Sequence, residues 1–422
     1  MTKDYQRLAI VSKLFTEKTL KDILLNKTGG KNVSVTGWIF GDASAKGDSY
    51  LSTVDRITIE GIVDEEPITV KVVVKSLPRN LGRRKTFRST DFFYNEIIFY
   101  SKIVPVFDKF IKSKNQSHLL RVPKCLSYVL DGENDFIVLE DVSVYGFGVA
   151  SRQNTLSLAE CKSILTGMGR FHGISFAHKD QHEKEFYNVA DQLIETYFSE
   201  NHRNWYKNFH ALILTVAKDA VSKQCGKTPE AQKFMKINAQ ELFNISIELC
   251  GRNKFPTSVV NHGDAWAPNF LIRTIESTGE IEALLLDFQL ARCASPVTDL
   301  SLLIYSCTDK TLRDEEFDNL LEFYHREVAN TISVLGSDPE KVYSWKQFLK
   351  EVKEQFVHGF SFSLEAVPIS MMEESEAFDL DIIKGDEAVD LSEIFNVKLI
   401  TDPAKRQRLA DVIMHAIQHE FI

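Results

Sequence analysis

Three oxygen-bearing side chains in the second half of the sequence have the types and spacing that phosphoryl transfer needs. Asp264 and Asn269 lie five positions apart, with Pro268 between them. The proline favours a tight loop over a helix, so both side chains can face one cleft. Asp287 follows the apolar strand predicted at 281–286, which is a rigid mount. Transfer from a nucleotide requires one carboxylate to accept a hydroxyl proton and oxygen ligands to hold Mg²⁺.

The residues beside these positions are expected to hold the loop rather than to react. Taken singly, an Asp or Asn in such a place is more often a turn former or a helix cap. Asp264, Asn269 and Asp287 occur in this order on a loop and after a strand, which favours a joint role. Their spacing parallels that of the catalytic loop and the metal-binding turn of protein kinases. His262 is expected to fix the loop by hydrogen bonding. Asp299 resembles the helix-start aspartate that braces the catalytic loop in kinase folds; a simple helix N-cap is the alternative, and the two roles are compatible.

A small N-terminal sheet must cover the nucleotide if these residues transfer a phosphoryl group. Strands are predicted at 33–40, 50–60 and 68–76, because these stretches are rich in β-branched residues and are separated by turn formers. The connection at 41–49 contains Gly47 and Ser49, the candidate phosphate contacts. It has no full G-x-G-x-x-G, and its composition also suits an ordinary hairpin loop.

A lysine and a glutamate are expected to pair behind this sheet. Lys75 ends a valine-rich strand and is the candidate for contacting the nucleotide phosphates. Lys71 has the same strand parity but lies nearer the start of the strand. Glu96 lies on a helix predicted at 89–103, among apolar residues at three- and four-residue spacings. A carboxylate placed there needs a cation, and Lys75 is the expected partner; the alternative is a glutamate that faces water.

The apolar strand predicted at 136–142 suits a hinge between two lobes, where the backbone of Glu140, Asp141 and Val142 would contact adenine. Beyond it, apolar spacing predicts helices at 156–176, 190–200, 205–224, 229–249, 297–306, 315–335, 345–362 and 403–420. We therefore predict an α+β, two-lobed protein-kinase-like fold. A small antiparallel-sheet lobe is expected at 1–142. A larger, mainly helical lobe is expected at 143–422, with the catalytic loop at 260–269 and the metal turn at 287–289.

Seven short runs together resemble one family of small-molecule kinases. They are Lys46-Gly47-Asp48-Ser49-Tyr50, Val74-Lys75-Ser76-Leu77-Pro78, Phe93-Tyr94-Asn95-Glu96-Ile97-Ile98-Phe99-Tyr100, Leu139-Glu140-Asp141-Val142, Gly169-Arg170-Phe171-His172-Gly173, Asn261-His262-Gly263-Asp264-Ala265-Trp266-Ala267-Pro268-Asn269 and Leu286-Asp287-Phe288-Gln289. With these runs the chain resembles the ecdysteroid-kinase-like, or choline-kinase-like (CHK), domain proteins of arthropods, within the aminoglycoside and choline phosphotransferase clan. Gln289 stands where protein kinases usually have glycine, which favours the small-molecule branch.

The resemblance implies a kinase that uses ATP and Mg²⁺ to phosphorylate a hydroxyl of a small molecule, with ecdysteroids or detoxification substrates as the leading classes. It makes Asp264 the catalytic base and Asn269 and Asp287 the magnesium ligands. A catalytically silent nucleotide-binding scaffold and a protein kinase are the alternatives. The complete set of candidate residues disfavours the scaffold. Only about ten residues separate Asp287 from a helix start at Pro296, too few for a protein-kinase activation segment.

The acceptor itself is left open by the sequence. A choline- or ethanolamine-type acceptor would call for an anionic or aromatic cage, whereas a steroid-sized acceptor needs an apolar pocket. Trp266, Tyr305, Phe360 and Phe362 are candidates to line either one, although each taken alone is a better core residue.

Composition favours a folded cytoplasmic monomer with neither a nucleic-acid nor a membrane partner. The net charge is −9, and the segment 371–395 alone holds nine acidic residues against one lysine, so no basic face is expected. This acidic segment is either a polar surface insertion or a flap near the substrate mouth. No signal-peptide pattern or membrane-length apolar run is present in the sequence. The six cysteines lack C-x-x-C or metal-ligand spacing and are expected to be reduced thiols.

Overall fold

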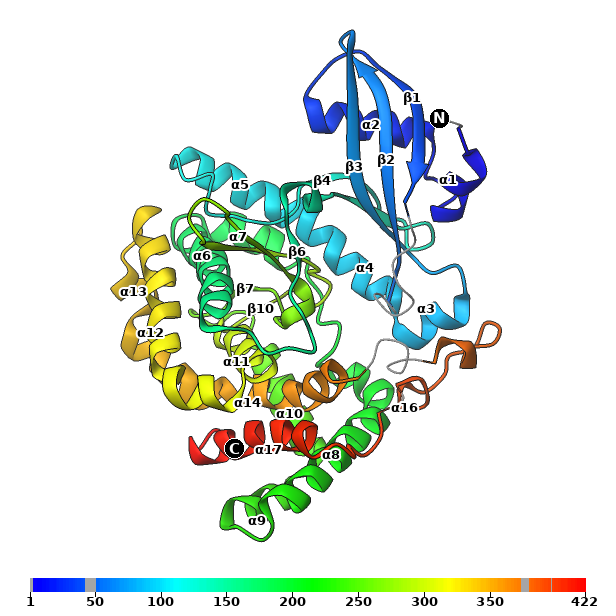
Figure 1. The fold of residues 1–422 in the computed structure, drawn as a ribbon. Coiled ribbons are helices and arrows are strands. Elements are labelled where there is room, and N and C mark those ends of the chain that lie inside the picture. Colours follow the sequence, from blue (N-terminus) through cyan, green and yellow to red (C-terminus); the bar gives the residue numbers. More distant parts are fainter. Residues whose placement is uncertain (1–2, 42–50, 373–378, 396) are drawn as a thin grey trace.

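An antiparallel sheet forms the smaller lobe of this computed structural model, which describes residues 3–41, 51–372, 379–395 and 397–422. The strand order is β1-β2-β3-β5-β4 (Figure 1). The strands are β1 Val33–Phe40, β2 Thr53–Val63, β3 Glu66–Ser76, β4 Cys125–Val129 and β5 Phe136–Glu140. Strands β2 and β3 pair in register along their full length. Asp64 and Glu65 between them both have positive φ, as a two-residue hairpin turn requires.

The two faces of this sheet contact different parts of the chain. Helices α1 (Tyr5–Val11) and α2 (Glu17–Thr28) cover one face, and apolar side chains of α2 pack there against Val72 and Val74 of β3. This burial of apolar surface stabilises the lobe. Because side chains alternate along a strand, Lys75 then points from the opposite face, where it meets Glu96. One face of β3 is thus covered by the N-terminal helices, and its other face, which contains Lys75, points toward the rest of the protein.

Three helical segments follow β3. They are α3 (Leu81–Phe87), α4 (Ser89–Ile98) and α5 (Val104–Ser113), and a π-helical turn at Phe99–Ile103 joins α4 to α5. The single helix predicted at 89–103 is therefore present, but its last turn is wider than an α-helical turn. Such turns are frequent at functional sites. Here the turn contains Phe99, whose ring stacks on that of Phe288 with 3.6 Å between the ring centroids.

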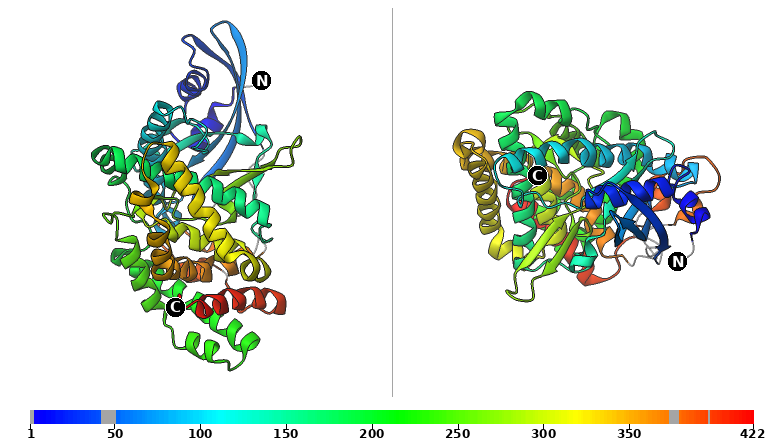
Figure 2. Two further views of the ribbon diagram at one scale, coloured as in Figure 1. Left: turned by 90° about the vertical axis from the view of Figure 1, so that its left-hand side faces the viewer. Right: turned by 90° about the horizontal axis from the view of Figure 1, so that it is seen from above.

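Helices build most of the larger lobe, with small sheets among them (Figure 2). The helices are α6 Leu158–Gln181, α7 Glu183–Ala190, α8 Arg203–Cys225, α9 Pro229–Met235, α10 Ala239–Cys250, α11 Val297–Cys307, α12 Lys310–Val334, α13 Pro339–Tyr343, α14 Trp345–Ser370, α16 Leu391–Ile394 and α17 Pro403–Gln418. Strands β6 (Gly148–Val149), β8 (Phe270–Thr274) and β9 (Ile281–Leu285) form one sheet, and β7 (Val259–Asn261) pairs with β10 (Arg292–Ala294). None of the helices in the described ranges is long and apolar enough to cross a membrane. The predicted α+β architecture of two lobes is confirmed.

The prediction of a helix at 190–200 is wrong. Helix α7 ends at Ala190, and the chain continues in turns. Asn95 of α4 holds this stretch by its side-chain amide, which accepts from the N–H of Ile194 and donates to its carbonyl, at 2.9 Å each. Glu195 accepts from two further backbone N–H groups. These side-chain hydrogen bonds replace those of a helix, which local apolar spacing cannot foresee.

The acidic segment of the larger lobe lies against α3 of the smaller lobe (Figure 1). A Cβ added to Gly82 would lie only 2.6 Å from the carbonyl oxygen of Gly385. The hydroxyl of Thr86 accepts from the N–H of Val389 at 3.0 Å. The described part at 379–395 therefore contacts the smaller lobe, which both a polar surface insertion and a flap near the substrate mouth allow.

Candidate active site

The catalytic loop begins where β7 ends and closes with a short 3-10 turn at Ala267–Asn269 before β8. The side-chain amide nitrogen of Asn269 donates to the carboxylate and to the backbone carbonyl of Asp264, at 2.9 Å each. Sequence spacing predicted that these two side chains meet, and this is confirmed. Burial and the nearby Asp287 carboxylate raise the pKa of Asp264 to about 7. A carboxyl group in this range is suited to accept a proton near neutral pH.

Asp299 braces this loop, as predicted. Its two oxygens accept from the backbone N–H groups of His262 at 2.6 Å and Gly263 at 2.8 Å. His172 of α6 bonds to the same carboxylate at 3.1 Å. Burial would raise the pKa of Asp299, but hydrogen bonding and the charge of His172 lower it. Helix α11 begins at Val297, and Asp299 lies in its first turn rather than at the capping position.

The loop can turn here only because it contains a glycine. Gly263 has φ +84°, and a Cβ on it would lie 1.9 Å from the carbonyl oxygen of Leu290. His262 is fully buried, donates from Nε2 to the carbonyl of Leu286 at 2.8 Å and packs against the ring of Phe288. Its predicted role in fixing the loop is confirmed.

Lys75 lies between two carboxylates. Its Nζ is 2.7 Å from Glu96 and 3.1 Å from Asp287. The predicted pairing with Glu96 is thus confirmed, and the glutamate does not face water. Burial lowers the pKa of Lys75, but the two carboxylates outweigh it and the pKa is raised, so the lysine is charged. Gln289 donates to the second oxygen of Glu96 at 3.3 Å, whereas Lys71 is exposed.

The residues at the metal turn fit Mg²⁺. Asp287 has φ +67°, a conformation that is uncommon for residues other than glycine and places its carboxylate beside Lys75. Its Oδ1 is buried and has no hydrogen-bond partner among the described residues. Asn269 uses its amide nitrogen on Asp264, which leaves its amide oxygen as the end able to bind a cation. One carboxylate and one amide oxygen are typical protein ligands for a magnesium ion that also contacts phosphates.

The candidate hinge residues use their side chains within the fold. Glu140 forms an ion pair with Lys27 of α2, and Asp141 pairs with Arg56 of β2 at 3.0 Å. Val142 follows them and is 7% exposed. Adenine contacts by their backbone groups stay a prediction. The other predicted nucleotide contacts, Gly47 and Ser49, lie outside the described residues.

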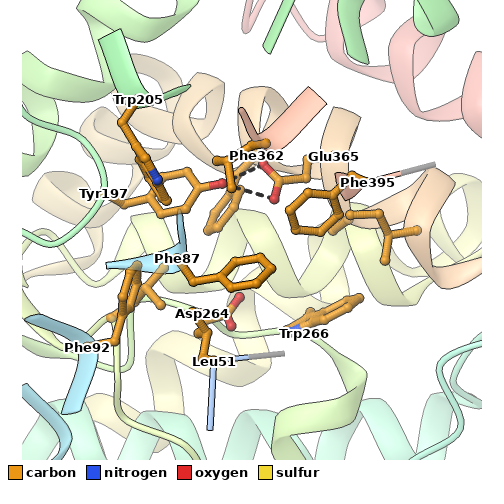
Figure 3. A pocket seen from close by; sticks show the side chains of 14 residues that line it. Leu51, Phe87, Phe92, Tyr197, Trp205, Asp264, Trp266, Phe362, Glu365 and Phe395 are labelled. Atoms are coloured by element: carbon orange, nitrogen blue, oxygen red, sulfur yellow. Dashed lines mark hydrogen bonds between the residues drawn. The ribbon is translucent and has the colours of Figure 1, made fainter. Parts of the chain in front are cut away.

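An aromatic cavity opens beside Asp264 (Figure 3). Its lining residues are Leu51, Phe87, Phe92, Tyr197, Trp205, Asp264, Trp266, Leu290, Phe362, Glu365, Ala366, Ile369, Leu391 and Phe395. Two of the four aromatic candidates, Trp266 and Phe362, thus line it, while Tyr305 and Phe360 are core residues.

Most of the cavity wall escaped sequence reasoning. Phe87 comes from α3, Tyr197 from the stretch mistaken for helix, and Leu391 from the acidic segment. Glu365 lies in an apolar run of α14, where one acid gives no local signal. Arg292, another residue missed, pairs with the half-buried Glu195 and donates to the Gly263 carbonyl of the catalytic loop at 3.2 Å.

Together, the two-lobed fold and its lysine, loop aspartate and strand-end aspartate define the class of kinase-like phosphotransferases. The chain belongs to the ecdysteroid kinase-like family, whose sequence model matches residues 46–337. Similar solved structures include a Plasmodium vivax ethanolamine kinase, with 13% identity, 80% of this chain and 78% of that chain covered, and a TM-score of 0.36. Another is assigned as a fructosamine-3-kinase from Haemophilus somnus 129PT. The identity is 12%, the match covers 87% of this chain and 100% of that chain, and the TM-score is 0.31. No curated protein matches the chain.

Proposed function

We propose that this protein is an ATP- and magnesium-dependent kinase that transfers the γ-phosphoryl group to a hydroxyl of a small, mainly hydrophobic acceptor. Membership of the ecdysteroid kinase-like family supports a small-molecule kinase. Ecdysteroids and detoxification substrates are the leading acceptor classes, and a choline- or ethanolamine-type acceptor is the alternative.

One observation carries this proposal: Asp264 belongs to the same loop as Asn269 and also lines the aromatic cavity. In the proposed reaction, the acceptor hydroxyl lies in the cavity next to Asp264. Its oxygen bonds to the γ-phosphorus while the bond from that phosphorus to the β–γ bridging oxygen breaks, ADP leaves, and Asp264 accepts the hydroxyl proton. Lys75, positioned by Glu96, holds the phosphates of the nucleotide. Asn269 and Asp287 would hold Mg²⁺, which neutralises charge that develops on the phosphates.

An apolar surface beside the hinge supports the place proposed for adenine. Val142 packs with Leu271 of β8 and Leu284 of β9, and this group is separate from the main core. A flat aromatic base needs such a surface beneath it and backbone polar groups at its edge. Strand β5, which leads into Val142, pairs with the strand that contains Lys75.

The cysteines fit the cytoplasm that we propose as the location. All six are free thiols. Burial raises the pKa of Cys293 to about 12, so this thiol near the metal turn is a poor nucleophile.

The test is a phosphotransfer assay with ATP and Mg²⁺ over ecdysteroids, steroid and xenobiotic glycosides, phenols and amino alcohols, with products detected by mass spectrometry. Asp264→Asn keeps the shape of the loop but cannot accept a proton, so we expect turnover to fall by about 10²–10⁴-fold. Its melting temperature and ATP affinity should stay close to those of the wild type. Magnesium-dependent ATP binding without any phosphorylated product would contradict the proposal and favour a nucleotide-binding scaffold.

A further inference from the structure

A buried carboxyl group of α14 faces the acceptor cavity. Glu365 is 7% exposed and lines the cavity together with Asp264 (Figure 3). Its oxygens accept from the hydroxyl of Tyr197 at 3.0 and 2.9 Å and from that of Tyr206 at 2.6 Å. Within the described ranges, no lysine, arginine or histidine forms an ion pair with it. Neutral donors therefore hold this carboxyl group where a cation would normally be found.

Two acidic side chains line the cavity, Glu365 from α14 and Asp264 from the catalytic loop. Burial raises the pKa of Glu365 to about 7, and the two tyrosine hydroxyls oppose the shift because they donate to the ionised form. The negative charge of Glu365 in turn acts on Asp264. Arg292, a cation that acts on Asp264, is already paired with Glu195 at 2.7 Å. A ligand that brings a positive charge would compensate this imbalance.

Aromatic rings surround the carboxyl group. The ring of Tyr197 lies 4.8 Å from that of Tyr206 and 5.3 Å from that of Phe362, measured between centroids. Trp205 and Phe395 complete this part of the wall. The faces of aromatic rings attract cations, and they do so more strongly where water is excluded.

We infer that Glu365 binds a basic nitrogen of the acceptor, so that the substrate class of this kinase is a hydrophobic amino alcohol whose hydroxyl lies at Asp264. This inference rests on the proposed kinase function and names its substrate. A neutral diol would also hydrogen-bond to Glu365, but it would leave the buried charge uncompensated. Ecdysteroids contain no basic nitrogen and are therefore disfavoured as acceptors by this inference.

The experiment compares amino alcohols with diols of equal chain length, such as 8-amino-1-octanol with 1,8-octanediol, as ligands of the full chain without nucleotide. Tryptophan fluorescence reports binding, because Trp205 and Trp266 line the cavity. We expect the amine to bind at least about tenfold more tightly than the diol at pH 8. Glu365→Gln should remove this preference and leave diol binding within about twofold, because the amide oxygen still accepts from the tyrosines.

Glu351→Gln is the matched control. Glu351 also lies on α14, is 2% exposed and accepts from a tyrosine hydroxyl at 2.8 Å, but it lies outside the cavity lining. The amine preference should survive this change. Tyr206→Phe, a second variant that removes one donor from Glu365, should weaken the preference.

Three results would each overturn the inference: no amine preference at any chain length, a preference that persists in Glu365→Gln, or an equal loss in Glu351→Gln. Failure of the kinase proposal is distinguishable from these, because phosphoryl transfer would then be absent while the binding preference remained.

Discussion

At the phosphate side of the site, Lys75 lies between two carboxylates, 2.7 Å from Glu96 and 3.1 Å from Asp287. In the acceptor cavity, Glu365 is bonded instead by two tyrosine hydroxyls. The first arrangement keeps a cation ready for phosphates and a carboxylate ready for a metal ion. The second keeps a carboxylate ready for a positive group. The comparison teaches that a fixed lysine distinguishes the region that binds phosphates, whereas a carboxyl group bonded only by neutral donors distinguishes the acceptor cavity.

Removing the cation from the phosphate side should have the largest effect. Lys75→Met takes away the group that holds the phosphates, and we expect kcat/KM to fall by about 10²–10³-fold, equal to about 3–4 kcal/mol. Lys71→Met on the same strand is the control and should keep wild-type kinetics, because Lys71 is exposed. Steady-state kinetics with saturating acceptor measures both. Equal losses in the two variants would contradict the assignment of Lys75.

Neutralising the cavity carboxyl should change stability in a pH-dependent way. The pKa of Glu365 is raised by burial from 4.5 to about 7, with Tyr197, Tyr206 and Asp264 as the titratable groups that act on it or bond to it. The folded state therefore holds this proton more tightly than the unfolded state does. As the pH rises from 4.5 through 7, the free energy of unfolding of the wild type therefore falls by up to about 3 kcal/mol. Glu365→Gln has no carboxyl group at this position and does not show this fall.

Urea unfolding of both proteins at pH 5 and pH 8 measures this difference. Relative to the wild type, the free energy of unfolding of Glu365→Gln should be higher at pH 8 than at pH 5. A gap that is independent of pH would show that the carboxyl group is not strained by burial, and the contrast between the two regions would then disappear.

Separating the acidic segment from α3 should have the smallest effect. In Gly82→Ala the new Cβ would lie 2.6 Å from the Gly385 carbonyl, so the segment must shift, at a cost of about 1–3 kcal/mol. Hydrogen exchange at 383–391 should accelerate, and KM for the acceptor should rise while KM for ATP stays unchanged. Gly148→Ala is the control, since its Cβ would meet no described atom within 4 Å. Unchanged exchange in Gly82→Ala would refute the contact.

The phosphate side could be predicted from the sequence because its groups follow one another on regular elements. Asp264, Asn269, Asp287 and Asp299 span a single loop, strand and helix start, and the structure brings the first three together with the fourth as brace. Strand periodicity left Lys71 and Lys75 as candidates, and the position of Lys75 at the end of the valine-rich strand selected the lysine that pairs with Glu96.

The cavity could not be predicted in the same way. Its wall combines Phe87, Tyr197, Glu365 and Leu391, which are far apart in the chain and meet only through tertiary packing. The stretch that contains Tyr197 has helical apolar spacing, yet the amide of Asn95, about 100 residues earlier, holds it in turns. No local pattern encodes such a contact.

The outer wall of the cavity has a consequence for how this kind of protein diversifies. Leu391 and Phe395 line the cavity, and no residue of the described range 379–395 belongs to the lysine pair, the catalytic loop or the metal turn. Substitutions in this segment can therefore change which molecules are accepted without altering the groups that transfer phosphate. Acceptor specificity and catalytic rate can therefore evolve independently. Members of such a family can acquire new substrates through substitutions in the C-terminal wall of the cavity.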